Sequence, residues 1–181
     1  QQFHASTAGG LAIASPPDTG VSQSPIRPDF KGTPLAEPEE ELDKGQFPAL
    51  SNLSSRRNGV RYTYHEGEVR SVDELDNLPV VGRGILPNFQ FDSAKKAEYF
   101  GFQYKALLKV EKAGRYHIMC SSDDGTKVWL DGKLILDNDG VHGTSWIESY
   151  ATLGSGFHRL EVKYFQKIGN KEFKLTWEDP D

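Results

Sequence analysis

The sequence lacks several features that would define a class of protein. It has one cysteine, Cys120, so an intramolecular disulfide cannot form. No apolar run approaches the roughly 18 residues of a membrane span, so we expect no membrane insertion. No basic block occurs, and the net charge is −5, with 26 acidic and 21 basic residues. This charge balance disfavours nucleic acid or an anionic membrane as the main partner.

Signatures of common enzyme classes are also missing. The five histidines show no His-x-x-x-His or Cys/His zinc spacing, and no Gly-x-Ser-x-Gly elbow is present. Gly82 and Gly84 are not followed by the Lys-Ser/Thr of a phosphate loop. Cys120 shares an alternating stripe with Tyr116 and Ile118, which favours a buried, inert thiol. We therefore predict that the chain is not an enzyme.

The composition divides the 181 residues into two parts. Residues 1–59 hold most of the ten prolines, and frequent X-Pro steps block helices and interior strands. We expect a Pro-rich extended segment or linker there, with one short strand possible at residues 11–14. No signal peptide is visible and the chain starts at Gln1, so we expect a processed or trimmed chain.

Residues 60–178 show the alternation of β-strands separated by turn signals. Apolar residues recur at every second position from Tyr99 to Val110, and Asp131-Gly132 is the strongest hairpin signal. One helical turn is expected at residues 72–78, because Ser71 can cap it and Pro79 ends it. Strands at this spacing predict an all-β fold, an antiparallel β-sandwich or a barrel.

Two adjacent carboxylates, Asp123 and Asp124, stand in a tight loop between two of these predicted strands. Their repulsion must be offset by water, backbone N–H groups or a cation. Calcium ligation is one interpretation, since calcium takes six to eight oxygen ligands. The alternative is that an aspartate caps the turn, with Gly125 at positive φ. Adjacent acids in one loop do not provide the two separated carboxyls of a glycosidase.

Several spaced motifs resemble the PA14 domain, a module of anthrax protective antigen, yeast flocculins and adhesins, and bacterial glycosidases. The resemblance covers about residues 60–178. It rests on Tyr64-His-Glu-Gly67, Ala113-Gly-Arg-Tyr116, Ser122-Asp-Asp-Gly125, Val128-Trp-Leu-Asp-Gly132, and Gly156-Phe-His158 followed by Val162-Lys-Tyr-Phe165.

The resemblance implies a β-sandwich with a carbohydrate-binding or accessory role outside the cell and no catalysis. In its calcium-dependent lectin members an Asp-Asp pair, joined by a cis peptide, binds calcium that in turn binds sugar hydroxyls. The matching positions are Asp123 and Asp124. A later loop completes the shell with an asparagine and backbone carbonyls. The matching loop, residues 166–171, offers Gln166 and Asn170 as metal ligands but departs from the pattern.

Other polar and aromatic residues are candidates for sugar binding. Asp137, Asn138, Asp139 and His142 form a polar cluster, which binds sugar or a cation or is an ordinary hairpin loop. The run does not fit an EF-hand, which needs a glycine at loop position 6 and a glutamate at 12. Trp129 and Trp146 can stack on a pyranose or be buried under a loop, and Trp177 is expected to be buried.

We therefore predict a non-catalytic carbohydrate-binding module of a secreted or cell-surface protein, located extracellularly, in the periplasm or on the cell surface. Its expected partners are a glycan or polysaccharide and other domains of a parent enzyme, with calcium as the one candidate cofactor. The alternative is a structural or docking domain of a larger secreted glycoside hydrolase, without a sugar or calcium site of its own.

Overall fold

The computed structural model describes residues 4–5, 11–12, 46–47, 59–91 and 93–180. The prediction of an extended Pro-rich segment at residues 1–59 falls largely outside these residues. Within it, three two-residue strands are described: β1 (His4–Ala5), β2 (Leu11–Ala12) and β3 (Gln46–Phe47). β1 pairs with β2, and β3 runs parallel to the end of β10.

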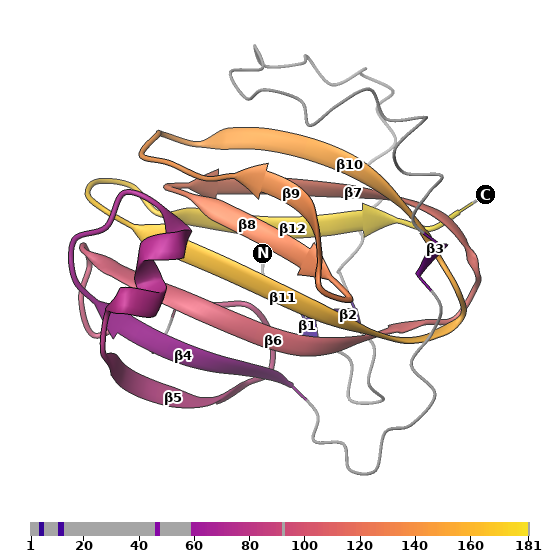
Figure 1. Cartoon of the computed structure of the whole chain (residues 1–181), viewed down its shortest axis with the longest axis horizontal. Coiled ribbons are helices and arrows are strands. Elements are labelled where there is room, and N and C mark those ends of the chain that lie inside the picture. The colour runs from indigo at the N-terminus through magenta and orange to yellow at the C-terminus, as the bar shows by residue number, and fades with distance from the viewer. Residues whose placement is uncertain (1–3, 6–10, 13–45, 48–58, 92, 181) are drawn as a thin grey trace, which may run out of the picture.

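The described residues form a sandwich of two sheets, shown in Figure 1. The six-stranded sheet has the order β5-β4-β6-β11-β8-β9, and the four-stranded sheet has the order β12-β7-β10-β3. The long strands pair antiparallel, which confirms the predicted all-β antiparallel sandwich. Their bounds are β4 (Val60–Glu66), β5 (Val80–Leu86), β6 (Phe100–Val110), β7 (Gly114–Asp123), β8 (Thr126–Leu130), β9 (Lys133–Asn138), β10 (Ser145–Leu153), β11 (Gly156–Gln166) and β12 (Glu172–Glu178).

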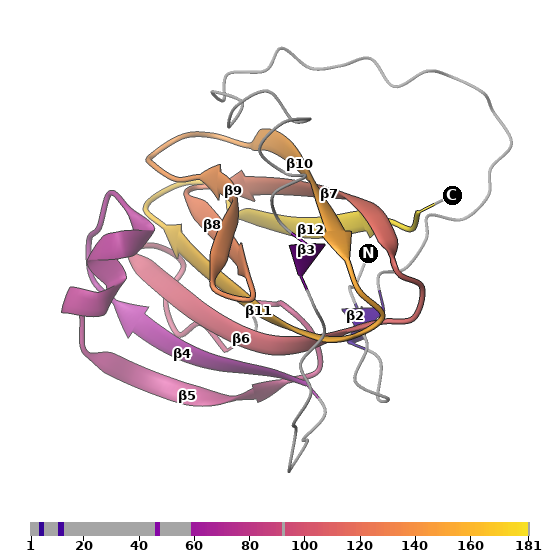
Figure 2. The same cartoon turned by 45° about the vertical axis from the view of Figure 1, so that its right-hand side comes forward.

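The main core lies between the two sheets, which Figure 2 shows from a second direction. Alternate residues of β6 and β11 face inward, and Tyr104 pairs with Val162 across the two strands. Stacked and edge-on rings dominate this core, among them Phe102 and Tyr104 with centroids 5.2 Å apart. Cys120 is fully buried here, and burial raises the pKa of its thiol, as expected for an inert cysteine.

A second, smaller core lies on the outer face of the six-stranded sheet. The 3₁₀ helix η1 (Val72–Asn77) covers it, with Leu75 packed close to Gly101 of β6. Ser71 caps η1 by accepting a hydrogen bond from the backbone N–H of Asp73 at 3.2 Å, which confirms the predicted helical turn and its cap. Lys163 of β11 ties the helix to the sheet through Asp76, at 2.8 Å.

Two elements differ from the sequence expectation. Residues 80–86 form a full strand, β5, which was not predicted because Gly82 and Gly84 interrupt the apolar alternation. A Cβ at Gly84 would lie 2.9 Å from the Tyr62 ring, so Gly84 makes room for an aromatic side chain of β4. The prediction that the polar loop starts at Asp137 is wrong, since β9 continues to Asn138, which pairs with Thr126 of β8.

Candidate ligand-binding loop end

Three loops meet at the end of the sandwich where η1 lies, as Figure 1 shows. They are the β7–β8 turn, the β9–β10 loop at residues 139–144 and the β11–β12 loop at residues 167–171. We call these three loops the acidic loop end, because Asp123 and Asp124 stand at its centre. The predicted site residues lie in these loops and on the strands next to them, β8, β9, β10 and β11.

Asp124 fastens the other two loops to the β7–β8 turn. Its Oδ1 accepts a hydrogen bond from the backbone N–H of His142 at 3.1 Å, and its Oδ2 accepts one from the backbone N–H of Lys167 at 2.7 Å. The residue is 3% exposed. Both carboxylate oxygens therefore act as acceptors for loop backbone, in the way expected of a structural aspartate.

The Asp123 carboxylate has weaker hydrogen bonds than the Asp124 carboxylate. Its Oδ2 lies 3.4 Å from the Thr144 hydroxyl, and the residue is 6% exposed. No lysine or arginine forms an ion pair with Asp123 or Asp124 within the described residues. Burial, followed by the neighbouring Asp124 carboxylate, raises the pKa of Asp123. The peptide bond between the two aspartates is cis, as the resemblance described above implies.

A buried tyrosine links the turn to the β11–β12 loop. The Tyr164 hydroxyl lies 2.5 Å from the Asp123 carbonyl and 2.9 Å from the Gln166 side-chain oxygen. The Gln166 amide donates to the carbonyl of Asn170 at 2.8 Å, and Gln166 is 1% exposed. Burial, followed by the charges of Asp124, Asp123 and Glu172, raises the pKa of Tyr164, so it remains a donor at any physiological pH.

Asp137 and Asp139 turn away from the acid pair, toward Lys127 and η1. Asp139 accepts hydrogen bonds from the Ser71 hydroxyl at 2.6 Å and from the Val72 backbone N–H at 2.9 Å. The Lys127 ammonium lies 3.2 Å from Asp139 and 4.0 Å from Asp137. These contacts hold η1 onto the sheet, and any role of the two aspartates in sugar binding stays a prediction.

Asn138 and His142 hold the β9–β10 loop in shape beside the acid pair. The Asn138 amide donates to the Ser122 hydroxyl at 2.8 Å and to the Ser145 carbonyl at 3.2 Å. The ring nitrogens of His142 lie 2.9 Å from the Asn138 carbonyl and 2.7 Å from the Gly143 carbonyl. These contacts hold the loop whose His142 backbone N–H donates to Asp124.

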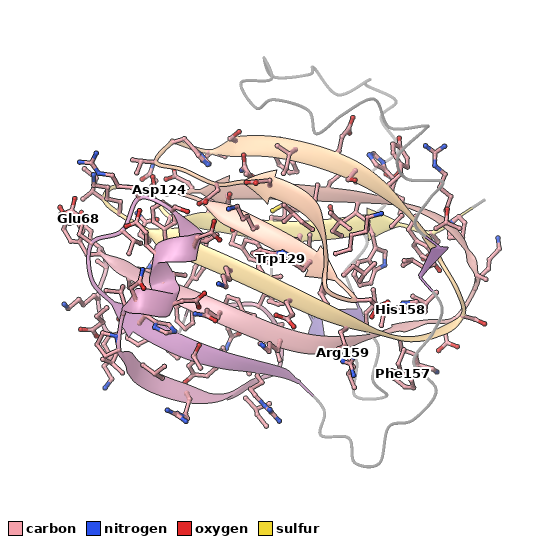
Figure 3. The ribbon with its side chains drawn as sticks, viewed as in Figure 1. Glu68, Asp124, Trp129, Phe157, His158 and Arg159 are labelled. Atoms are coloured by element: carbon pink, nitrogen blue, oxygen red, sulfur yellow. The ribbon has the colours of Figure 1, made fainter. Side chains whose placement is uncertain are left out.

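The three tryptophans lie on three different strands, and Trp146 pairs with Ser121, two residues before Asp123. Trp129 is half-buried on β8, against the small core under η1, with the Lys163 ammonium 5.9 Å from its ring centre. Figure 3 labels Trp129 and Asp124, which are separate. Trp146 lies on β10 with the Lys174 ammonium 5.5 Å from its ring centre. Trp177 packs against the main core, as expected. Trp129 and Trp146 thus belong to different sheets, and their role in sugar binding stays a prediction.

The acidic loop end fits a calcium ion in part. Two carboxylates without a lysine or arginine partner, a threonine hydroxyl and loop carbonyls are the oxygen donors that calcium takes. Gln166 fits poorly, because protein groups occupy both ends of its amide. The Asn170 side chain is exposed and has no hydrogen-bond partner in the part of the chain that the structure describes. Within the described part of the chain, no three His, Cys, Asp or Glu side chains are grouped to hold a metal.

Three residues of this end were not predicted from the sequence. Thr144 approaches Asp123, Tyr164 binds the Asp123 carbonyl, and Glu172 pairs with Asp123 across β12 and β7. Tyr164 alternates with the inward residues of β11, so its periodicity predicted a core residue and gave no sign of a hydroxyl directed at the turn. Only the strand register brings Glu172 opposite Asp123.

Removing the Asp123 charge is expected to stabilise the metal-free protein. Since its pKa is raised, the folded state binds a proton more tightly than the unfolded state, and stability falls as pH rises above about 4. Asp123→Asn should therefore raise the free energy of unfolding at pH 7 by about 1 kcal/mol, or a few degrees in Tm. Thermal melts between pH 3.5 and 8 test this, because the gain should vanish at the acid end. A gain of equal size at every pH would contradict it.

The chain is an antiparallel β-sandwich with an acidic pair among its end loops. The family model "PA14 domain" matches residues 87–181, more than half of the chain, and the chain belongs to the PA14 family. β4 and β5 precede the matched residues but pair within the same sheet as β6. No curated protein sequence matches the chain.

Solved structures share the fold at low sequence identity. A PA14 sugar-binding domain from an RTX adhesin has a TM-score of 0.55 and 17% identity, over 67% of this chain and 89% of that one. The PA14 domain of the MpAFP antifreeze protein has a TM-score of 0.53 and 13% identity, over 71% and 87%. A β-glucosidase from Kluyveromyces marxianus has a TM-score of 0.55 and 17% identity, over 68% of this chain and 17% of that chain.

An anti-sigma factor domain-containing protein is also similar, with a TM-score of 0.57 and 18% identity. The match covers 67% of this chain and spans 43% of that protein's length. Among the described residues, no helix is long and apolar enough to cross a membrane.

Proposed function

We propose that the chain is a non-catalytic, glycan-binding PA14 module that acts outside the cell and binds its ligand at the acidic loop end. The observation that carries the proposal is the buried Asp123–Asp124 pair, which has no lysine or arginine partner among the described residues. Like charges at this spacing favour uptake of a cation. The family, and its likeness to a sugar-binding domain of an RTX adhesin, supports the glycan as ligand.

In this proposal calcium is held by the carboxylates of Asp123 and Asp124. When bound, the ion supplies a positive centre that binds sugar hydroxyls. The protein's own residues hold the surrounding loops. Asp124 anchors two of them through the backbone N–H groups of His142 and Lys167, and Tyr164 fixes the turn through the Asp123 carbonyl. Since the loops are already tied together, the site needs little rearrangement to bind a ligand.

A specific observation favours a second candidate, a structural or docking domain of a larger secreted glycoside hydrolase. Both oxygens of Asp124 bind backbone N–H groups, and Gln166 closes the β11–β12 loop by bonding the Asn170 carbonyl. In this candidate, these hydrogen bonds alone hold the loops together, and no ion is needed. The similarity to a β-glucosidase, of which this chain spans 17%, is compatible with such a role.

Calcium and glycan titrations separate the two candidates. If the acidic loop end binds calcium, Tm should rise with added calcium, by several degrees at about a hundredfold excess over Kd. Glycan binding, measured on a glycan array and by calorimetry, should require calcium and be lost in Asp123→Asn. Glu74→Gln is the control, since Glu74 is an exposed acid on η1, away from the pair.

The docking candidate predicts the opposite results. Tm would not respond to calcium, and no glycan would bind with or without the ion. A calcium response that persists unchanged in Asp123→Asn would place the ion elsewhere and contradict the proposed site.

A further inference from the structure

The outer face of the six-stranded sheet carries a diagonal band of basic residues that runs from β5 to β11. Outward positions of β5, β4, β6 and β11 contribute Arg83, Arg61, Lys105 and Arg159 in turn. Arg61 pairs directly with Lys105, while Arg83 and Arg159 each lie one diagonal step further, at positions paired with Thr63 and Leu107. We call these four residues the basic band. It crosses four neighbouring strands, about 14 Å measured perpendicular to them, and its two ends are offset further along the strands.

The arginines of this band have no partner. Within the described residues, the side chains of Arg61, Arg83 and Arg159 form neither ion pairs nor hydrogen bonds, and all three are exposed. Figure 3 shows the Arg159 side chain projecting from β11. Lys105 has one weakly placed partner, Glu161, at 3.4 Å with both side chains exposed.

Other cations on the same face are neutralised. Lys127 binds Asp73 at 2.6 Å, and Lys163 binds Asp76 at 2.8 Å, so η1 supplies a carboxylate to each. Cations next to η1 are therefore paired with its carboxylates, whereas the arginines of the basic band are not. Unpaired guanidinium groups on adjacent strands repel one another, and a bound anion removes that repulsion.

The shape and charge of the band indicate what it binds. A flat sheet face suits an extended polymer, and the planar guanidinium forms paired hydrogen bonds with carboxylate or sulfate groups. Ile85, 45% exposed, and the half-buried Leu107 lie beside the arginines and can contact the C–H surface of sugar rings. The net charge of −5 disfavours any densely charged polyanion, so a polymer with spaced charges and C–H surface fits the band better than nucleic acid does.

We propose that the basic band binds an acidic polysaccharide whose carboxylate or sulfate groups are spaced along an extended chain. The band lies on the sheet face, whereas the acidic loop end lies at the tip of the sandwich. It contains no metal ligand, so this binding does not need calcium. The proposal is therefore independent of the function proposed above and can fail or succeed without it.

Affinity electrophoresis and calorimetry with three polymers test this. Polygalacturonate carries carboxylates, dextran sulfate carries sulfates, and dextran is the neutral control, each with excess chelator present. Wild-type protein should bind at least one charged polymer and not dextran. Arg61→Gln and Arg159→Gln should each weaken binding about threefold to tenfold, and the double variant about tenfold to a hundredfold.

Arg70→Gln is the matched control, because Arg70 is an exposed arginine of the loop before η1 and lies outside the band. It should bind as wild type does, and all variants should keep the wild-type Tm. Equal losses in Arg70→Gln and Arg61→Gln would overturn the proposal, since binding would then follow net charge alone. Absence of binding to both charged polymers, or equal binding of duplex DNA, would also overturn it.

Discussion

Replacing Gly125 by alanine is expected to destabilise the protein by about 3 kcal/mol, enough to lower Tm by roughly 10 °C. A Cβ at this position would lie 2.3 Å from the Phe165 ring, 2.8 Å from Asp139 Oδ1 and 2.8 Å from the Gly140 backbone nitrogen. The ring and the backbone are both packed, so neither can move without disturbing the small core or the β9–β10 loop. Thermal and denaturant unfolding measure the loss.

Gly143→Ala provides the matched control for this prediction. Gly143 lies in the β9–β10 loop, near Gly125, but a Cβ there would have no heavy atom within 4 Å. Its replacement should change the free energy of unfolding by less than about 0.5 kcal/mol. If both variants were equally stable, the tight contact around Gly125 would be contradicted, and the turn would have room to accept a side chain.

Gly125 illustrates what the sequence could and could not predict at this site. The Asp-Asp-Gly motif indicated a tight turn and the PA14 fold, and both are confirmed. The expectation of positive φ at Gly125 is wrong, since its backbone is not in the left-handed region. The glycine is required for space, because Phe165, forty residues later, and Asp139 pack against it. Contacts between distant segments of this kind leave no local pattern.

The same reasoning explains why Asp139 contacts η1 and Lys127. The sequence showed that Asp137, Asp139 and Trp129 flank the acid pair in neighbouring strands and loops, but it did not show that η1 lies against that face. The helix brings Ser71 and Asp73 to the sheet, and Asp139 and Lys127 are used to hold it. Strand alternation predicts which face a side chain occupies, whereas the element covering that face depends on long-range packing.

The acid pair itself divides into two roles that a sequence motif cannot separate. Asp124 is used to join loops, because each of its oxygens meets a backbone N–H group. Asp123 carries the charge that the described structure leaves least compensated, and burial raises its pKa. An accessory domain without a ligand would need Asp124 to join the loops but would not need the Asp123 charge. Keeping the Asp123 charge lowers the stability of the protein at neutral pH, and a bound cation would remove that loss.

The β8–β9 hairpin, at the end of the sandwich opposite the acidic loop end, is held by a buried histidine, His158. His158 is fully buried, and its ring nitrogens lie 2.7 Å from Asp131 Oδ2 and 2.8 Å from the Gly154 carbonyl. Asp131 Oδ1 also accepts the backbone N–H of Arg159 at 2.6 Å. The Asp131-Gly132 turn, with φ of 49° and 84°, is thereby fastened to β11.

Removing the Asp131 side chain is expected to cost about 3 kcal/mol, because it leaves a buried imidazole and a backbone N–H without an acceptor. Asp131→Gly tests this without strain at positive φ, which Asp131→Ala would add. Asp131→Asn should lose about 1 kcal/mol, since its amide can donate to the ring and its oxygen can accept from Arg159. Denaturant unfolding should therefore show that the Asn variant has the highest free energy of unfolding of the three, the Gly variant a lower one and the Ala variant the lowest. Equal stability of the Asn and Gly variants would show that the bonds to His158 and Arg159 do not hold the hairpin.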